Sequence, residues 1–146
     1  MWPITLLCVA VASAYEDGKS GDSKTGCGGC HGYDPASTTS VELWADVTAV
    51  APDEVVNIEL VVSTTNPDHV AAGLDVSASG GRFTAGAGTK IKDGDITHRS
   101  PVAMVGSSTA FKWTWTASGP GTYQLYGAGN AVNDNGSKRG DGWNLA

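Results

Sequence analysis

The sequence has few cationic side chains, few cysteines and no long helical pattern. It contains nine Lys and Arg against fifteen Asp and Glu, which gives a net charge of −6 and an isoelectric point near 4.8. Such a chain is not expected to bind nucleic acid or an anionic membrane by electrostatic attraction. It also lacks a recognisable Ser/His/Asp triad or paired-carboxylate site, so we expect a protein that is not an enzyme.

An uncharged and mostly apolar run, residues 2–14, opens the chain, but it is too short to span a bilayer. The run ends in Ala12-Ser13-Ala14, a small-x-small pattern that is typical of a signal-peptide cleavage site. We therefore expect a signal peptide over 1–14, cleavage after Ala14, and a periplasmic or extracellular protein without stable membrane insertion. Cys8 lies within this segment and would be removed with it.

The two remaining cysteines, Cys27 and Cys30, are separated by two residues, and His31 follows directly. Cys-x-x-Cys-His is the attachment signature of c-type haem. One turn of backbone brings both thiols to one edge of the porphyrin, and the next residue can reach the iron. Gly28 and Gly29 add no side chain to this crowded turn. The sequence thus predicts one covalent haem c, with Cys27 and Cys30 as thioether anchors and His31 as the proximal iron ligand.

Other interpretations of the cysteine pair stay open. A disulfide between Cys27 and Cys30 would suit an exported protein, but it leaves the adjacent histidine unexplained. A zinc site needs a second pair of ligands, and the other two histidines, His69 and His98, are isolated in the sequence. A thioredoxin-like redox pair needs a βαβ context, which the sequence does not indicate.

A second axial ligand would come from His98, His69 or Met104, and spacing alone does not decide among them. His98 lies in a loop-like stretch between two expected strands, from which an imidazole could swing toward a haem edge. His69 begins an expected strand, where simple exposure would explain it, and Met104 has the apolar neighbours of a core residue. The choice matters because a His/His pair gives a lower potential than His/Met, and an open position would admit a small gas or peroxide.

The pattern of apolar residues predicts an all-β fold. Glycine is frequent, with 20 residues, and no long segment has the 3.6-residue period of a helix. Alternation predicts strands over 41–49, 56–62, 70–79, 82–85, 111–116 and 123–128. We expect an antiparallel β-sandwich over 41–146, preceded by a flexible lead with the haem-attachment turn over 15–40. Phe111, Trp113 and Trp115 share one strand face and are expected in the core.

Four segments follow one another in a recognisable order: 82–86, 97–100, 111–117 and 126–133. Together they resemble the bacterial choice-of-anchor V domain, which is related to Reeler domains. The resemblance covers nearly the whole mature chain and implies an Ig- or Reeler-like sandwich. The family's histidine in the Thr-His segment falls on His98, so the resemblance makes His98 the preferred distal ligand. Many relatives carry a C-terminal anchoring segment, whereas this sequence stops at Ala146, which implies a free protein.

These expectations combine into one functional hypothesis, an exported monohaem c-type cytochrome that carries electrons. Its partner would be a redox protein or the haem of a neighbouring copy, so self-association is a further expectation. The alternative is a secreted or cell-surface binding or adhesion module in which the cysteine pair or the haem is structural. A haem enzyme or gas sensor with an open iron position is a lesser alternative. The Asn-rich stretch 133–141 favours a hydrogen-bonded turn over a calcium site.

Overall fold

The computed structural model describes residues 16–146, so the expected signal peptide over 1–14 and its cleavage site lie outside the described residues. Within this range the chain consists of strands and one short 3-10 helix. The elements are η1 (Cys27–Gly29), β1 (Thr39–Ala45), β2 (Val55–Thr64), β3 (Ala71–Ala78), β4 (Arg82–Thr84), β5 (Thr89–Lys92), β6 (Asp95–His98), β7 (Val102–Ala103), β8 (Ser108–Thr116), β9 (Leu125–Val132) and β10 (Gly142–Leu145).

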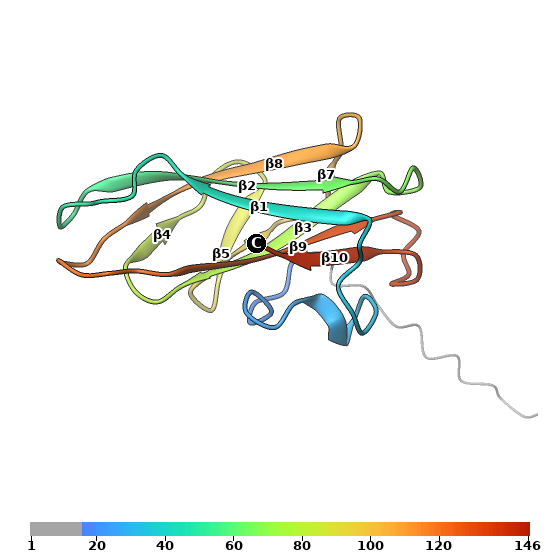
Figure 1. Cartoon of the computed structure of the whole chain (residues 1–146), viewed down its shortest axis with the longest axis horizontal. Coiled ribbons are helices and arrows are strands. Elements are labelled where there is room, and N and C mark those ends of the chain that lie inside the picture. The colour runs from blue at the N-terminus through green and yellow to red at the C-terminus, as the bar shows by residue number, and fades with distance from the viewer. Residues whose placement is uncertain (1–15) are drawn as a thin grey trace, which may run out of the picture.

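The strands form two sheets that pack face to face (Figure 1). Sheet A has the strand order β1-β2-β8-β4, and sheet B has the order β10-β9-β3-β6-β5, with β7 paired to β3. All pairings of these strands are antiparallel. The predicted all-β antiparallel sandwich is therefore confirmed.

The core lies between the sheets and follows from the two-residue period of the strands. On β2 the side chains of Val56, Ile58, Leu60 and Val62 are all buried, while their neighbours alternate outward. The aromatic triplet Phe111, Trp113 and Trp115 on β8 packs in the same core, as predicted. Each such side chain contributes about 1.5–3 kcal/mol by leaving water, so these two adjacent strands dominate the stability of sheet A.

Sheet B differs from the sequence-based prediction in several parts, and the short strands β5 and β7 were not predicted. β10 was not predicted, because its four residues are too few for a periodic signal. The strand expected over 123–128 runs over Leu125–Val132 instead. His98 lies in strand β6 and not in a loop, because the Asp93-Gly94 turn, with positive φ at both residues, makes β5 and β6 a tight hairpin.

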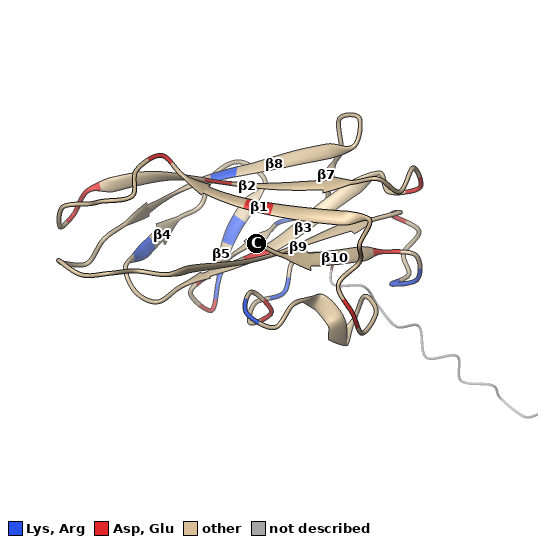
Figure 2. Ribbon diagram, in the orientation of Figure 1, with Lys and Arg blue, Asp and Glu red and all other residues tan. Residues whose placement is uncertain are grey.

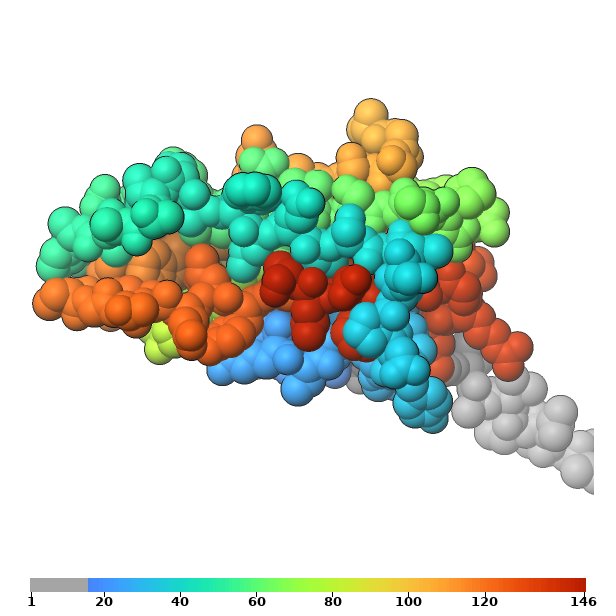
Figure 3. All heavy atoms as spheres, in the orientation of Figure 1, coloured from blue at the N-terminus to red at the C-terminus, as the bar shows by residue number. Residues whose placement is uncertain are grey.

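Residues 16–36 cross the outer face of sheet B, beneath β9 and β10 in Figure 1, and pack closely against the C-terminal strand in Figure 3. This segment was predicted to be a flexible lead, yet hydrogen bonds fasten it to the sheet. Asp75 of β3 accepts the backbone N–H groups of Asp22 and Ser23 at 2.7 and 2.8 Å. Lys92 of β5 donates to the Gly18 carbonyl at 2.8 Å. The Cys-x-x-Cys-His turn thus has a fixed position.

Acidic side chains are spread over loops at both ends of the sandwich and over the N-terminal segment (Figure 2). Several cationic side chains have acidic partners nearby, such as Lys19 with Asp22 at 2.7 Å and Lys112 with Glu59 at 3.6 Å. The described residues therefore offer no basic stripe of the kind that tracks a nucleic-acid backbone.

Candidate functional site

The cysteine pair lies in a single tight turn. The 3-10 helix η1 begins at Cys27, whose carbonyl accepts the backbone N–H groups of Cys30 at 3.0 Å and His31 at 2.9 Å. Both cysteines are half-buried, and they are free thiols, so the structure does not form the alternative Cys27–Cys30 disulfide. The turn brings the two thiols and the imidazole to one short stretch of backbone, as the sequence pattern predicted.

Trp143 of β10 is the support on which this turn rests. Its indole lies against the backbone of Gly26 so closely that a Cβ at that position would approach Cζ3 to 1.8 Å. The indole N–H donates to the Gly32 carbonyl at 3.1 Å, and the Trp143 carbonyl accepts the N–H of Ala36 at 2.8 Å. Trp143 therefore contacts the turn before, within and after the Cys-x-x-Cys-His motif.

His31 is held by a carboxylate from the other end of the chain. Its Nδ1 lies 2.8 Å from Oδ2 of Asp141, and the side chains of His31 and Asp141 are 15% and 2% exposed. The other oxygen of Asp141 accepts the backbone N–H of Asn133 at 3.2 Å. Because an ionised carboxylate can only accept, His31 donates its Nδ1 proton and the Nε2 atom is left for another partner.

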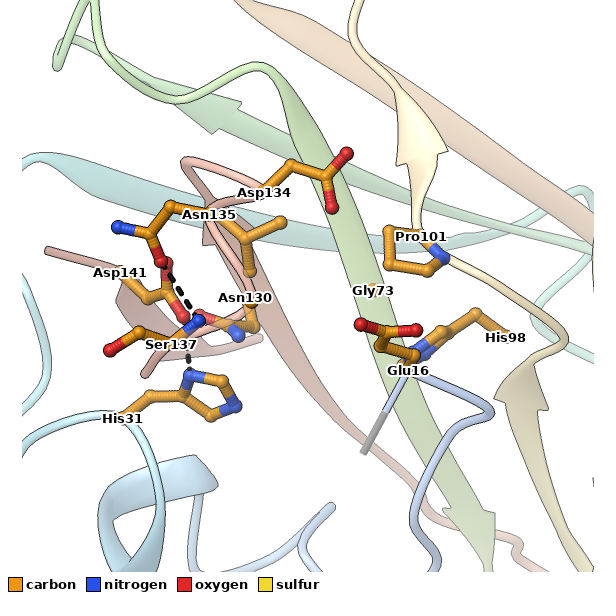
Figure 4. A pocket seen from close by; sticks show the side chains of 12 residues that line it. Glu16, His31, Gly73, His98, Pro101, Asn130, Asp134, Asn135, Ser137 and Asp141 are labelled. Carbon is orange, nitrogen blue, oxygen red and sulfur yellow. Dashed lines mark hydrogen bonds and ion pairs between the residues drawn. The ribbon is translucent and has the colours of Figure 1, made fainter. Parts of the chain in front are cut away.

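His98 reaches the same region from strand β6. Its ring lies over Gly73 of β3, where a Cβ would approach Cε1 of His98 to 2.5 Å. Its Nδ1 is 3.1 Å from the backbone nitrogen and 3.3 Å from the carbonyl oxygen of Leu74. Figure 4 shows His31 and His98 on opposite sides of one hollow, with Gly73 between them.

Two adjoining hollows lie between these imidazoles, on the outer face of sheet B. Their cavity volumes are about 60 and 50 Å³, and both open to solvent. The second is lined by both thiols and both imidazoles, from Cys27, Cys30, His31 and His98. The fold thus brings together four of the residues that the sequence singled out.

The other two candidate ligands do not line these hollows. His69 was expected to be exposed at a strand start, but it is 5% exposed. Its Nδ1 lies 2.8 Å from the Thr64 hydroxyl, and its Nε2 lies 2.8 Å from the Gly140 carbonyl. Both ring nitrogens are therefore engaged in holding loops together. Met104 is half-buried and packs against the hydrophobic core, which matches its interpretation as an ordinary core residue.

The second hollow is lined by Asp75 and Cys27, and both have raised pKa values. Asp75 is 3% exposed, and its Oδ1 has no hydrogen-bond partner among the described residues. Burial, followed by the nearby charges of Asp95 and Asp22, raises the pKa of Asp75 to about 7, although two backbone N–H groups act in the opposite direction. Burial, together with Asp22 and Asp75, raises the pKa of the Cys27 thiol to about 12. Cys27 is thus kept as a neutral thiol in the folded chain.

The Asn-rich loop between β9 and β10 is a chain of hydrogen-bonded turns, as predicted. Asn133 and Asn135 each accept the N–H two residues further on, and Asn133 also donates to the Arg139 carbonyl at 3.0 Å. In the part of the chain that the structure describes, no group of three or more His, Cys, Asp and Glu side chains is arranged to hold a metal ion. A haem iron differs from such a centre because it draws only its two axial ligands from the protein.

Sequence reasoning missed Trp143, Asp141 and Asp75. Each lies in a strand, or at the end of one, more than forty positions from the turn in the sequence. Asp75, for example, binds the backbone of Asp22 across a separation of 53 residues. The one signal that could have pointed to Trp143 is an isolated aromatic residue among small and polar neighbours near the C-terminus.

Comparisons with known proteins give fold-level similarity only. No family model matches the chain, and no curated protein does. The resemblance to the choice-of-anchor V domain therefore stays a prediction. Residues 16–146 contain no helix with the length and apolar character that crossing a bilayer requires.

Three solved structures share part of the architecture. A DUF4466 family protein from Parabacteroides merdae has a TM-score of 0.48 at 10% identity over 77% of this chain, and the chain spans 44% of its length. The chitin-binding domain of a chitinase from Pyrococcus furiosus has a TM-score of 0.46 at 13% identity, covering 71% of this chain and 93% of that domain. The Reelin-N domain of F-spondin has a TM-score of 0.45 at 15% identity, covering 88% and 90%.

Proposed function

We propose that this chain is an exported monohaem c-type cytochrome, which carries electrons and is not an enzyme. The observation that carries the proposal is that both free thiols and two imidazoles, from Cys27, Cys30, His31 and His98, line one hollow. Export, with cleavage after Ala14, belongs to the same proposal, because haem c is attached outside the cytoplasm.

The donor atoms of the hollow fit a haem. The two thiols are unbridged, and Nδ1 of His31 is already bound to Asp141, which leaves Nε2 for a metal. The backbone N–H of Leu74 donates to Nδ1 of His98 at 3.1 Å, which places the proton of the neutral ring on Nε2. Metal binding through Nε2 would need the other tautomer, with Nδ1–H turned to the Leu74 carbonyl at 3.3 Å. The space between the two rings runs over Gly73, and Asn130 and the carboxylate of Glu16 also line it.

A bound haem would supply a one-electron Fe(III)/Fe(II) couple, and the chain would supply everything else. The thiols of Cys27 and Cys30 would tether the group, and His31 and His98 would hold its iron and keep small ligands away. A partner would approach the site on the side of the glycine-rich turn, beside the 97% exposed Tyr33 and the cations Lys138 and Arg139. This exposed side is where a redox partner or a neighbouring copy would exchange electrons.

The first prediction concerns covalent attachment. The chain expressed with its leader in a host that makes c-type cytochromes should give a red product with a haem c pyridine haemochrome spectrum. Its mass should equal the chain cleaved after Ala14 plus one haem. The double variant Cys27→Ser/Cys30→Ser should be colourless, whereas Ser37→Ala, an exposed change in the same segment, should attach haem normally. A colourless product of unaltered mass from the original chain would overturn the proposal.

The second prediction concerns the distal ligand. The reduced haem protein should resist carbon monoxide, because two protein ligands occupy the iron. The variant His98→Ala should bind carbon monoxide, with a complete Soret shift at gas levels that leave the original chain unchanged. Met104→Leu, which alters the alternative ligand, should behave like the original chain. Equal carbon monoxide binding by the original chain and His98→Ala would remove His98 from the proposal.

A secreted or cell-surface binding module is the second candidate function, and Trp44 favours it. This side chain is 60% exposed on β1, on the outer face of sheet A. It borders a groove of about 700 Å³, partly open to solvent, that Asp46, Asn57, Glu59 and Lys112 also line. A flat exposed indole among hydrogen-bonding side chains suits a polar ligand with an apolar face, such as a sugar.

The two candidates separate in one experiment. A binding module should bind chitin or a related glycan equally well with and without haem, and Trp44→Ala should abolish that binding. An electron carrier should not bind the glycan, so Trp44→Ala should change nothing. Its haem should be reduced and reoxidised by a one-electron mediator. Self-association of the electron carrier would appear as a mass above that of one chain in light scattering.

A further inference from the structure

The structure assigns to Asp141 the role of a positioning residue for the proximal imidazole, one that also lowers the reduction potential of the site; this inference rests on the proposed haem-binding function. Asp141 precedes β10 and touches His31, from which it is separated by 110 residues.

The geometry of the contact restricts the imidazole. The carboxylate accepts the Nδ1 proton at 2.8 Å, so His31 takes the tautomer with a lone pair on Nε2. Asp141 cannot easily turn away, since its other oxygen holds the N–H of Asn133 and its side chain is 2% exposed. The ring plane and the direction of Nε2 are therefore set before any metal arrives.

The charge of Asp141 has a second effect. A carboxylate behind a metal-bound imidazole makes that imidazole a stronger donor and stabilises the more positive oxidation state. With Asp141 almost fully buried, water screens this charge poorly. Fe(III) is stabilised relative to Fe(II), so the carboxylate shifts the redox equilibrium toward the oxidised protein.

The test separates the charge from the hydrogen bond. Asp141→Asn removes the charge and keeps one oxygen acceptor, which can serve Nδ1–H of His31 while the N–H of Asn133 loses its partner. In the haem-loaded chain it should shift the Fe(II)/Fe(III) equilibrium about tenfold toward Fe(II), which is about 59 mV for one electron. The matched control is Asp68→Asn, an exposed aspartate between β2 and β3 that makes the same change of charge and lines neither hollow. This control should shift the equilibrium by less than about twofold, since solvent screens an exposed charge. Equal shifts in the two variants would overturn the inference.

A second measurement uses the haem-free chain, so its outcome does not depend on the proposed function. Nitrogen-15 NMR of His31 should show the Nδ1-protonated tautomer in the original chain and in Asp141→Asn. Asp141→Ala, which removes the acceptor, should lose that preference. An Nε2-protonated His31 in the original chain would refute the role of Asp141. Failure of the original chain to take up haem would instead refute the proposed function and leave this measurement valid.

Discussion

Gly26→Ala is expected to detach the Cys-x-x-Cys-His turn from β10. A Cβ at this position would lie 1.8 Å from Cζ3 of Trp143, and Gly26 has φ of +80°, which side chains other than glycine rarely adopt. Overpacking and the left-handed backbone together should lower the free energy of local opening of residues 22–36 by about 2–4 kcal/mol. Native-state hydrogen exchange measures this directly, through the amide of His31 that donates to Cys27.

Gly29→Ala is the matched control for that variant. Gly29 ends the 3-10 helix that begins directly after Gly26, but a Cβ at Gly29 meets nothing within 4 Å. For Gly29→Ala, the free energy of local opening from hydrogen exchange and the free energy of unfolding should both stay within about 0.5 kcal/mol of the original chain. If both variants behaved alike, the contact with Trp143 would not be what holds the turn.

The second large effect is expected from Asp75→Asn, and it depends on pH. Burial raises the pKa of Asp75 to about 7, so between about pH 4 and pH 7 the folded chain binds more protons than the unfolded chain. Stability should therefore fall as the pH rises through this window, with the full cost of the buried charge present above pH 7. Asparagine keeps an acceptor for Asp22 and Ser23 without the charge. The variant should be more stable than the original chain by about 1–3 kcal/mol at pH 8 and nearly equal at pH 4.

Urea unfolding at pH 4, 6 and 8 checks this expectation. Asp68→Asn, an exposed aspartate in the loop between β2 and β3, should show a difference from the original chain that does not change with pH. If the stability difference between Asp75→Asn and the original chain also did not change with pH, then Asp75 would be solvated, or charged at no cost, in the folded chain.

The parts of the molecule that could be predicted from the sequence are those set by local pattern. The alternation of apolar and polar residues from Val56 to Val62 predicted both the strand β2 and its buried face. The alternating aromatic residues Phe111, Trp113 and Trp115 predicted the strand β8 and its buried face. The turn at Cys27–Gly29 followed from the spacing of two thiols and two glycines. In each case the information lies within about ten neighbouring residues.

The rest could not be predicted, because its physical causes are distant in the chain. His69 resembled an exposed strand residue until the fold brought the Gly140 carbonyl to its ring, 71 residues away. His98 resembled a loop residue, but the Asp93-Gly94 hairpin makes it part of a strand beside Gly73. No local pattern distinguishes Asp141 from the other aspartates, and only the folded sandwich brings it into contact with His31.

The contact between Trp143 and Gly26 has a consequence for timing. A polypeptide leaves the ribosome with its N-terminus first, so Cys27 and Cys30 emerge long before the strand that carries Trp143 exists. Until that strand docks, both sulfurs are accessible to a modifying enzyme. After docking, Cys27 is a shielded neutral thiol, the less reactive form. Covalent modification of Cys27 is therefore favoured during biogenesis, before Trp143 docks against the turn.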